Sequence, residues 1–133
     1  MKFLDRLQPL ALLILRVSLG AIMVAHGKGK IFGGMGEHYA SVVKLGMPGW
    51  LAYPSAIAEF FGGILLIAGL GTRIVAIFVL VNMLVALFKV HYPRGFTGPG
   101  NYQFTLMLSA AAFVHMVMGA GAFSLDWLFG RKK

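Results

Sequence analysis

Ionisable and strongly polar residues interrupt the long apolar stretches of this 133-residue chain, and they are the residues that could do chemistry. Arg16, Glu59 and Asn82 each lie well inside such a stretch. Charged groups are rare inside a membrane because burying them is costly, and they usually face a ligand site or an ion pathway. An arginine there could hold an anionic or carbonyl oxygen, and a glutamate could exchange a proton.

The spacing of these three residues predicts that they meet. Counted inward from the outer ends of their stretches at about 1.5 Å per residue, Arg16, Glu59 and Asn82 lie about 12–15 Å deep. A guanidinium fork that meets a carboxylate, with an amide between them, satisfies several hydrogen bonds at once. We therefore expect Arg16 to pair with Glu59. The alternative interpretation is that the cluster only fixes how the helices pack.

A second group of polar residues is expected above this pair, at the outer ends of the apolar stretches. A polar mouth that leads to the cluster would be formed by His26, Lys28, Lys30, Lys89, His91 and Gln103. A histidine there titrates near neutral pH and could pass protons between water and a buried carboxylate. The competing interpretation is that these are ordinary residues facing lipid headgroups. Together with Arg16, Glu59 and Asn82, the candidate ligand pocket consists of His26, Lys30, His91 and Gln103.

Composition places the chain in a membrane. It is 59% hydrophobic and 12% charged, which leaves too little polar surface for a water-soluble globule. The net charge of +8 comes from twelve lysines and arginines, most of them near the ends of apolar stretches, where anionic lipid attracts cations. This distribution favours a lipid partner and not nucleic acid. There is no cysteine, so a redox role would need a borrowed cofactor or a partner protein.

The chain is expected to be all-α: a single domain built as an antiparallel bundle of four transmembrane helices. The apolar stretches predict spans at residues 9–25, 51–70, 74–90 and 104–119, each about the length that a tilted helix needs. Helices are required because the backbone must satisfy its own hydrogen bonds in lipid. Residues 69–73 predict a tight turn between the second and third spans, and residues 37–45 a short helix on the membrane surface. Both termini are expected on the cytoplasmic side.

Other kinds of site are not supported by sequence patterns. A metal site formed by His26, His38 and His91 would depend on their positions in space only, because no linear spacing supports one. His115 has no second histidine at matched depth for haem. The glycines and lysines at 27–30 do not fit a phosphate-binding loop, and no serine lies in a nucleophile elbow. An enzyme that works alone is therefore not expected.

A series of different short motifs extends along almost the whole chain. They are Leu15-Arg16 with Gly20, His26-Gly27 with Lys30, Leu45-Gly46-Met47-Pro48, Ala58-Glu59-Phe60-Phe61-Gly62-Gly63, Gly71-Thr72-Arg73, Met83 with Ala86 and His91, Gly95-Phe96, Tyr102-Gln103-Phe104 and Ser124-Leu125-Asp126. Their order and spacing resemble the DoxX family of small four-helix membrane proteins. One departure is Gln103, where related sequences often carry an acid, so a role that depends on that charge does not carry over.

The resemblance implies a membrane protein of the prokaryotic cell (inner) membrane that is linked to redox complexes. Some family members are similar to a membrane subunit of thiosulfate:quinone oxidoreductase. The expectation is a non-autonomous oxidoreductase subunit that docks a redox partner and binds quinone or another small solute near Arg16, Glu59 and His91. Two alternatives stay open. One is a small solute or proton-coupled transporter, which with four spans would need to form a homo-oligomer. The other is a structural assembly factor.

Overall fold

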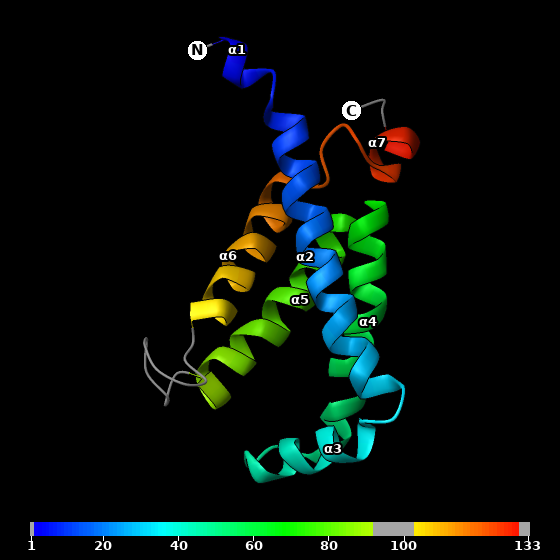
Figure 1. Cartoon of the computed structure of the whole chain (residues 1–133), viewed down its shortest axis with the longest axis vertical. Coiled ribbons are helices and arrows are strands. Elements are labelled where there is room, and N and C mark those ends of the chain that lie inside the picture. Colours follow the sequence, from blue (N-terminus) through cyan, green and yellow to red (C-terminus); the bar gives the residue numbers. More distant parts are fainter. Residues whose placement is uncertain (1, 92–102, 131–133) are drawn as a thin grey trace.

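A computed structural model of the chain describes residues 2–91 and 103–130, except the side chains of residues 90, 91 and 130. The described residues form helices and connecting turns, without strands, so the predicted all-α class is confirmed (Figure 1). In chain order the elements are α1 (Lys2–Asp5), α2 (Gln8–Ile31), α3 (Met35–Lys44), a 3-10 turn (Gly49–Leu51), α4 (Ala52–Ala68), α5 (Thr72–Ala86), a π-helical segment (Leu87–His91), α6 (Gln103–Met118) and α7 (Leu125–Gly130).

Helix α2 is longer than the apolar stretch that predicted it. It starts with Pro9 in its first turn, where the missing amide hydrogen costs nothing, and it continues to Ile31 instead of ending near residue 25. Gly27 and Gly29 do not break the helix. Gly27 is buried against the backbone of Phe60 on α4, so its lack of a side chain is used for packing. As a result Lys30 lies in the last turn of a helix and not in a loop.

The antiparallel pair α2 and α4 has the most extensive interface in the described structure. A Cβ atom on Gly20 would lie 2.6 Å from the carbonyl oxygen of Gly63, and a Cβ on Gly63 would lie 2.6 Å from the carbonyl oxygen of Gly20. Glycine is therefore required on both sides for the two backbones to approach so closely. These contacts place Gly20 opposite Gly63 and Gly27 opposite Phe60, and this register positions the polar residues.

The turn between α4 and α5 is as tight as predicted. Helix α4 ends at Gly69, whose φ of 73° is left-handed, and Gly71 precedes α5 with a φ of 61°. The amides of Gly69 and Leu70 bond back to the carbonyl of Leu65, which is a common way to end a helix at glycine. Helices α4 and α5 are consequently adjacent and antiparallel, and α5 packs along α6 on its other side (Figure 1).

The distribution of side chains is inverted relative to a soluble protein. Arg16, Glu59 and His115 are buried, whereas large apolar side chains such as Ile74 and Phe78 are 65% and 63% exposed. Among the described residues, three helical segments are long and apolar enough to cross a membrane: Gln8–Ile31, Gly49–Ala68 and Thr72–Lys89. Helix α6 is apolar but has only 16 residues. The described structure is thus that of an all-α membrane protein, and a count of four crossing helices stays a prediction.

The two ends of the molecule differ. Helices α1 and α7 lie at one end, and α3 lies across the other end, beside the start of α4 (Figure 1). Helix α3 matches the short helix predicted for residues 37–45. It buries Val42 and exposes Tyr39 and Val43, so it has one face toward the bundle and one toward its surroundings. The candidate site lies at the α3 end.

Candidate functional site

The predicted pair of Arg16 and Glu59 is wrong. Arg16 is 1% exposed, and its guanidinium donates three hydrogen bonds to backbone carbonyls. The acceptors are the carbonyl oxygens of Leu66 (from Nε, 2.7 Å), Ala120 (from Nη1, 2.6 Å) and Phe123 (from Nη2, 2.8 Å). Arg16 therefore fastens the segment between α6 and α7 to the end of α4. It does not line the cavity described below.

Glu59 pairs with Lys30 instead. The Nζ atom of Lys30 lies 2.8 Å from Oε1 and 2.6 Å from Oε2 of Glu59. The Glu59 side chain is 5% exposed and that of Lys30 28% exposed, so the pair lies at the edge of the interior with its lysine toward the outside. The helix register explains this choice. Glu59 is next to Phe60, which faces Gly27, whereas Arg16 is level with the other end of α4.

Asn82 joins the ion pair as predicted, although to a different cation. Its Nδ2 donates to Oε1 of Glu59 at 3.2 Å, and its Oδ1 accepts a hydrogen bond from Oγ of Ser55 at 2.6 Å. The chain of hydrogen bonds thus runs from Ser55 through Asn82 to Glu59, and Lys30 closes it. Residues from α2, α4 and α5 meet in this polar cluster, which consists of Lys30, Ser55, Glu59 and Asn82.

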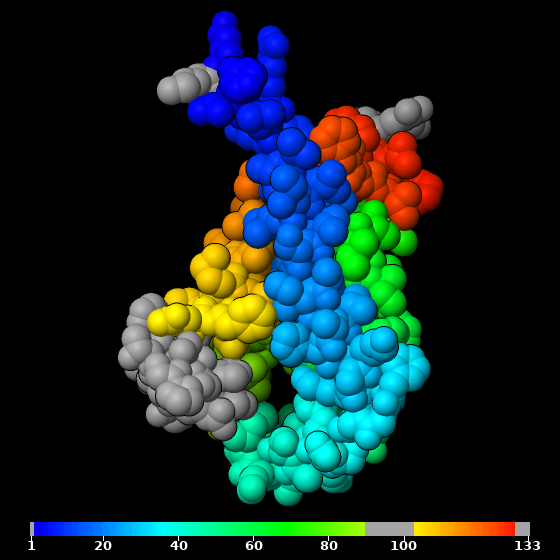
Figure 2. All heavy atoms as spheres, in the orientation of Figure 1, coloured from blue at the N-terminus to red at the C-terminus, as the bar shows by residue number. Residues whose placement is uncertain are grey.

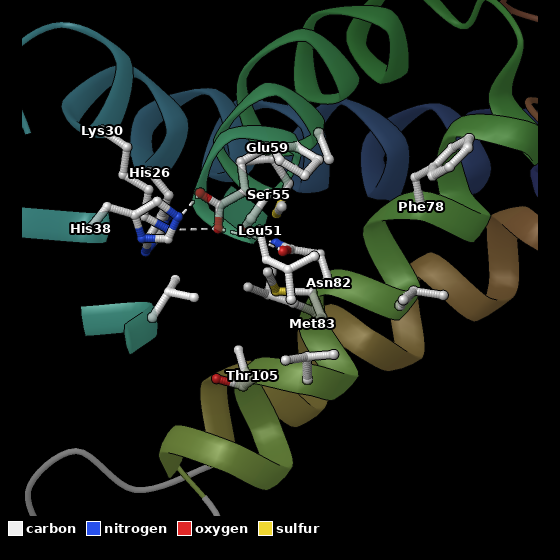
Figure 3. Close-up of a pocket in the computed structure, with 18 of the residues that line it drawn as sticks. His26, Lys30, His38, Leu51, Ser55, Glu59, Phe78, Asn82, Met83 and Thr105 are labelled. Atoms are coloured by element: carbon white, nitrogen blue, oxygen red, sulfur yellow. Dashed lines mark hydrogen bonds and ion pairs between the residues drawn. The ribbon is translucent and has the colours of Figure 1, made fainter. Parts of the chain in front are cut away.

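The polar cluster forms one end of a cavity of about 680 Å³ (Figure 3). Apart from this end, most of the cavity wall is apolar, and the wall is contributed by α2, α3, α4, α5 and α6. Met23, Val42, Leu51, Phe78, Met83, Phe104 and Leu108 are among the apolar lining residues. The space-filling view shows a hollow between the lower part of α2, α3 and α5 (Figure 2). A cavity of this size and character suits a small, largely apolar ligand with a polar group at one end.

His38 lines the same cavity from α3 and was not among the predicted site residues. Its Nε2 atom is buried and has no hydrogen-bond partner among the described residues. Burial lowers the pKa of His38 below its ordinary value, and the nearby ammonium of Lys30 lowers it further, against smaller opposing effects of Glu59 and the Ala52 carbonyl. His38 is thus a neutral imidazole beside the polar cluster. It was missed because no pattern in the sequence shows that α3 folds back over the cavity.

The remaining predicted site residues are only partly placed. His26 lines the cavity, and its Nδ1 is 2.8 Å from the carbonyl oxygen of Ile22 on its own helix, while its ring stacks on Phe104. Gln103 is the first residue of α6, is exposed and is not among the residues that line the cavity. The side chain of His91 lies outside the described residues. The structure therefore brings Lys30, Glu59, Asn82 and His26 together and separates Arg16 from them.

His115 is a buried residue of α6 that is not among the residues lining the cavity. His115 is fully buried, and its Nδ1 lies 3.1 Å from the carbonyl oxygen of Gly119 at the end of its own helix. Within residues 2–91 and 103–130, no group of three His, Cys, Asp or Glu side chains is arranged to hold a metal ion.

Known proteins resemble the chain over most of its length. It is 32% identical to the protein of Bacillus subtilis (strain 168) named "Putative oxidoreductase CatD", over 91% of this chain and 89% of that protein. It is 27% identical to the "Inner membrane protein YqjF" of Escherichia coli (strain K12), over 97% and 99% of the two chains. A protein of Haemophilus influenzae is 31% identical over 99% of this chain and 100% of its own.

No solved structure matches the chain significantly. The family model named DoxX matches residues 11–92, which include α2, α3, α4 and α5 and with them all four residues of the polar cluster. Because this match covers more than half of the sequence, the chain belongs to the DoxX family of membrane proteins.

Proposed function

We propose that this protein is a membrane subunit of a quinone-linked redox complex and that its cavity binds the quinone. The observation that carries the proposal is the cavity of about 680 Å³, whose wall is largely apolar and which has a polar end formed by Lys30, Glu59 and Asn82. A quinone has matching chemistry, because its ring carries polar oxygens and its tail is a hydrocarbon.

The wall of the cavity along α5 supports entry from the lipid. Ile77, Phe78, Val81 and Val85 line the cavity and are also 40–63% exposed on the outer surface of the helix. Apolar side chains that are open on the outside of a membrane protein are in contact with hydrocarbon. A lipid-soluble molecule can therefore approach the cavity between these side chains without crossing water.

Lys30, Asn82 and Glu59 of the polar cluster have different proposed roles toward the ligand. The Lys30 ammonium and the Asn82 amide are the hydrogen-bond donors nearest to the cavity's polar end, and both already face Glu59. A bound oxygen would share these donors, and Glu59 would exchange the proton that accompanies reduction or oxidation of the ligand. Electrons must come from or go to a partner protein, because the chain has no cysteine that could supply dithiol chemistry. The relative named as an oxidoreductase agrees with this role.

We also propose a location for this protein and an orientation in the membrane. The relative from Escherichia coli is named as an inner membrane protein, so we place this protein in the inner membrane of a prokaryote. Helices α1 and α7 share one end of the molecule (Figure 1), which agrees with both termini on the cytoplasmic side. The cavity, at the α3 end, then opens in the outer half of the bilayer.

The test is a mild-detergent purification from native membranes, followed by extraction of bound quinones and mass spectrometry of bound proteins. We expect quinone in the extract and a redox protein in the complex. An Ala58→Phe variant fills the cavity from α4, so it should lose the quinone, whereas Ile57→Phe, on the exposed face of the same helix, should keep it. A protein that is recovered alone and without quinone, and that instead carries solute flux in vesicles, would favour a transporter.

A further inference from the structure

The imidazole of His38 lines the cavity, and its Nε2 has no hydrogen-bond partner among the described residues. Figure 3 shows His38 reaching from α3 toward the polar end where Lys30 and Glu59 lie. Lys30 directs its ammonium at both oxygens of Glu59, and neither of these hydrogen bonds is made to His38. The Nε2 atom of His38 is buried and unpaired among the described residues. A buried polar atom without a partner is costly, and a ligand that supplies one gains affinity.

We propose that His38 is a ligand-binding residue whose Nε2 accepts a hydrogen bond from a ligand hydroxyl, so that the cavity prefers a quinol over the corresponding quinone. This inference rests on the proposed function and adds to it the form of the ligand. A quinol presents hydroxyl groups, which donate, whereas a quinone presents only carbonyl oxygens, which accept. The two forms have the same ring and tail, so the apolar wall does not distinguish them.

The surroundings of the ring determine that Nε2 is an acceptor. Burial and the positive charge of Lys30 keep the pKa of His38 low, so the ring is neutral. A neutral imidazole has one N–H and one nitrogen lone pair. The backbone of Ala52 raises the pKa of His38 slightly, which favours a proton on the ring nitrogen nearer to Ala52. Because Nε2 has no partner among the described residues, we assign the lone pair to Nε2, where it can accept a hydrogen bond from a donor.

The position of His38 also fits a ligand whose tail lies along the wall. From the polar end, the lining residues Phe78 and Val81 on α5 and Phe104 on α6 extend the cavity in the direction of lipid. A ring held between His38 and Asn82 would leave its tail on these side chains. Helix α3 thus contributes a specific contact to the ligand, in addition to forming part of the cavity wall.

The experiment compares ubiquinol-1 and ubiquinone-1 binding to the purified full-length protein in lipid nanodiscs under anaerobic conditions. His38→Phe keeps an aromatic ring and removes the acceptor. We expect it to weaken ubiquinol-1 binding about tenfold, the loss of one hydrogen bond, and to change ubiquinone-1 binding less than about twofold. Tyr39→Phe is the matched control, since Tyr39 lies on the same helix, is exposed and is not among the residues that line the cavity.

Each outcome decides between the two proposals. If wild-type protein binds neither form, the proposed quinone function fails and this inference fails with it. If wild-type protein binds both forms and His38→Phe weakens them equally or not at all, the quinone function stands and the role of His38 is overturned. If His38→Phe does not fold, His38→Gln decides, because the glutamine oxygen can accept the same hydrogen bond and should keep the preference for ubiquinol-1.

Discussion

Lys30 and Glu59 form an ion pair that joins the last turn of α2 to the middle of α4, with Nζ 2.6 Å from Oε2. The two partners differ in exposure, at 28% for the Lys30 side chain and 5% for that of Glu59. This asymmetry matters because the cost of breaking a pair depends on which charge is left behind. The lysine has a long stem and can turn outward to headgroups, whereas the carboxylate cannot leave the interior.

Lys30→Met should therefore destabilise the protein more than Glu59→Gln. We expect Lys30→Met to lower the free energy of unfolding by about 2–3 kcal/mol, because Glu59 keeps only Asn82 as a partner. Glu59→Gln should cost about 1 kcal/mol or less, since the lysine can turn outward. The double variant should recover much of the loss. Reversible unfolding in mixed micelles measures this, with the exposed Lys28→Met as the control. Equal losses for both single variants would contradict the assignment.

Arg16 should stabilise the packing of the α6–α7 segment on α4 and should not bind the ligand. Arg16→Lys removes the guanidinium fork that serves three carbonyls, and a carbonyl left buried without a donor costs about 1–3 kcal/mol. We expect faster hydrogen exchange across residues 119–130, measured by mass spectrometry, because this segment loses its attachment to α4. Quinone binding should change less than twofold. Arg6→Lys, at an exposed position, should change neither the hydrogen exchange nor the quinone binding. If Arg16→Lys lost quinone binding without faster hydrogen exchange, Arg16 would be a ligand-binding residue after all.

The sequence predicted the kind of fold well because its signals are local. The glycine turn at 69–73 and the short helix over 37–45 each depend on a few neighbouring residues, and each agrees with the structure. Glu59 and Asn82 were correctly expected to meet, since both lie at a similar distance from their helix ends.

The partner of Glu59 was mispredicted because it depends on helix register, which no local signal gives. Placing the end of α2 near residue 25 put Arg16 at the depth of Glu59 and Lys30 in a loop. The contact of Gly27 with Phe60 extends α2 to Ile31 and shifts Arg16 toward Leu66. His38 was missed for a related reason, since only the path of the chain after α2 brings α3 over the cavity.

Asp126 should stabilise the start of α5 from a distant part of the chain. Its two carboxylate oxygens accept hydrogen bonds from the amides of Gly71 (2.7 Å) and Thr72 (2.8 Å). A carboxylate at a helix N-terminus satisfies free amides and offsets the helix dipole. Asp126→Ala should lower stability by about 0.5–2 kcal/mol and speed hydrogen exchange at these amides. Asp5→Ala, an exposed acid on α1, should do neither, and unchanged exchange in Asp126→Ala would show that the cap is not formed.

The preference for quinol should depend on pH through His38. Lys30 and His26 on α2 and Glu59 on α4 are the other titratable side chains among the described residues that line the cavity. Because the pKa of His38 is lowered from 6.5, the ring stays neutral at and above that pH and becomes protonated only below it. The ratio of ubiquinol-1 to ubiquinone-1 affinity should be constant from pH 8 to about 6.5 and fall at lower pH, as Nε2 becomes a donor. The ratio should be independent of pH in His38→Phe and follow the wild type in Tyr39→Phe, which changes an exposed residue outside the cavity.

Two neighbouring glycines on α2 should respond oppositely to substitution. A Cβ on Gly27 would clash with the backbone of Phe60, so Gly27→Ala must push α2 away from α4 and strain the pair of Lys30 and Glu59. Gly29 has open space where a Cβ atom would lie. Gly29→Ala should therefore stabilise the helix by about 0.5–1 kcal/mol, because alanine lowers the backbone entropy of the unfolded chain. We expect Gly27→Ala to lower the melting temperature and weaken quinone binding, and Gly29→Ala to raise the melting temperature with binding unchanged. If Gly27→Ala were as well tolerated as Gly29→Ala, the close packing of α2 on α4 that sets the register of the whole site would be wrong.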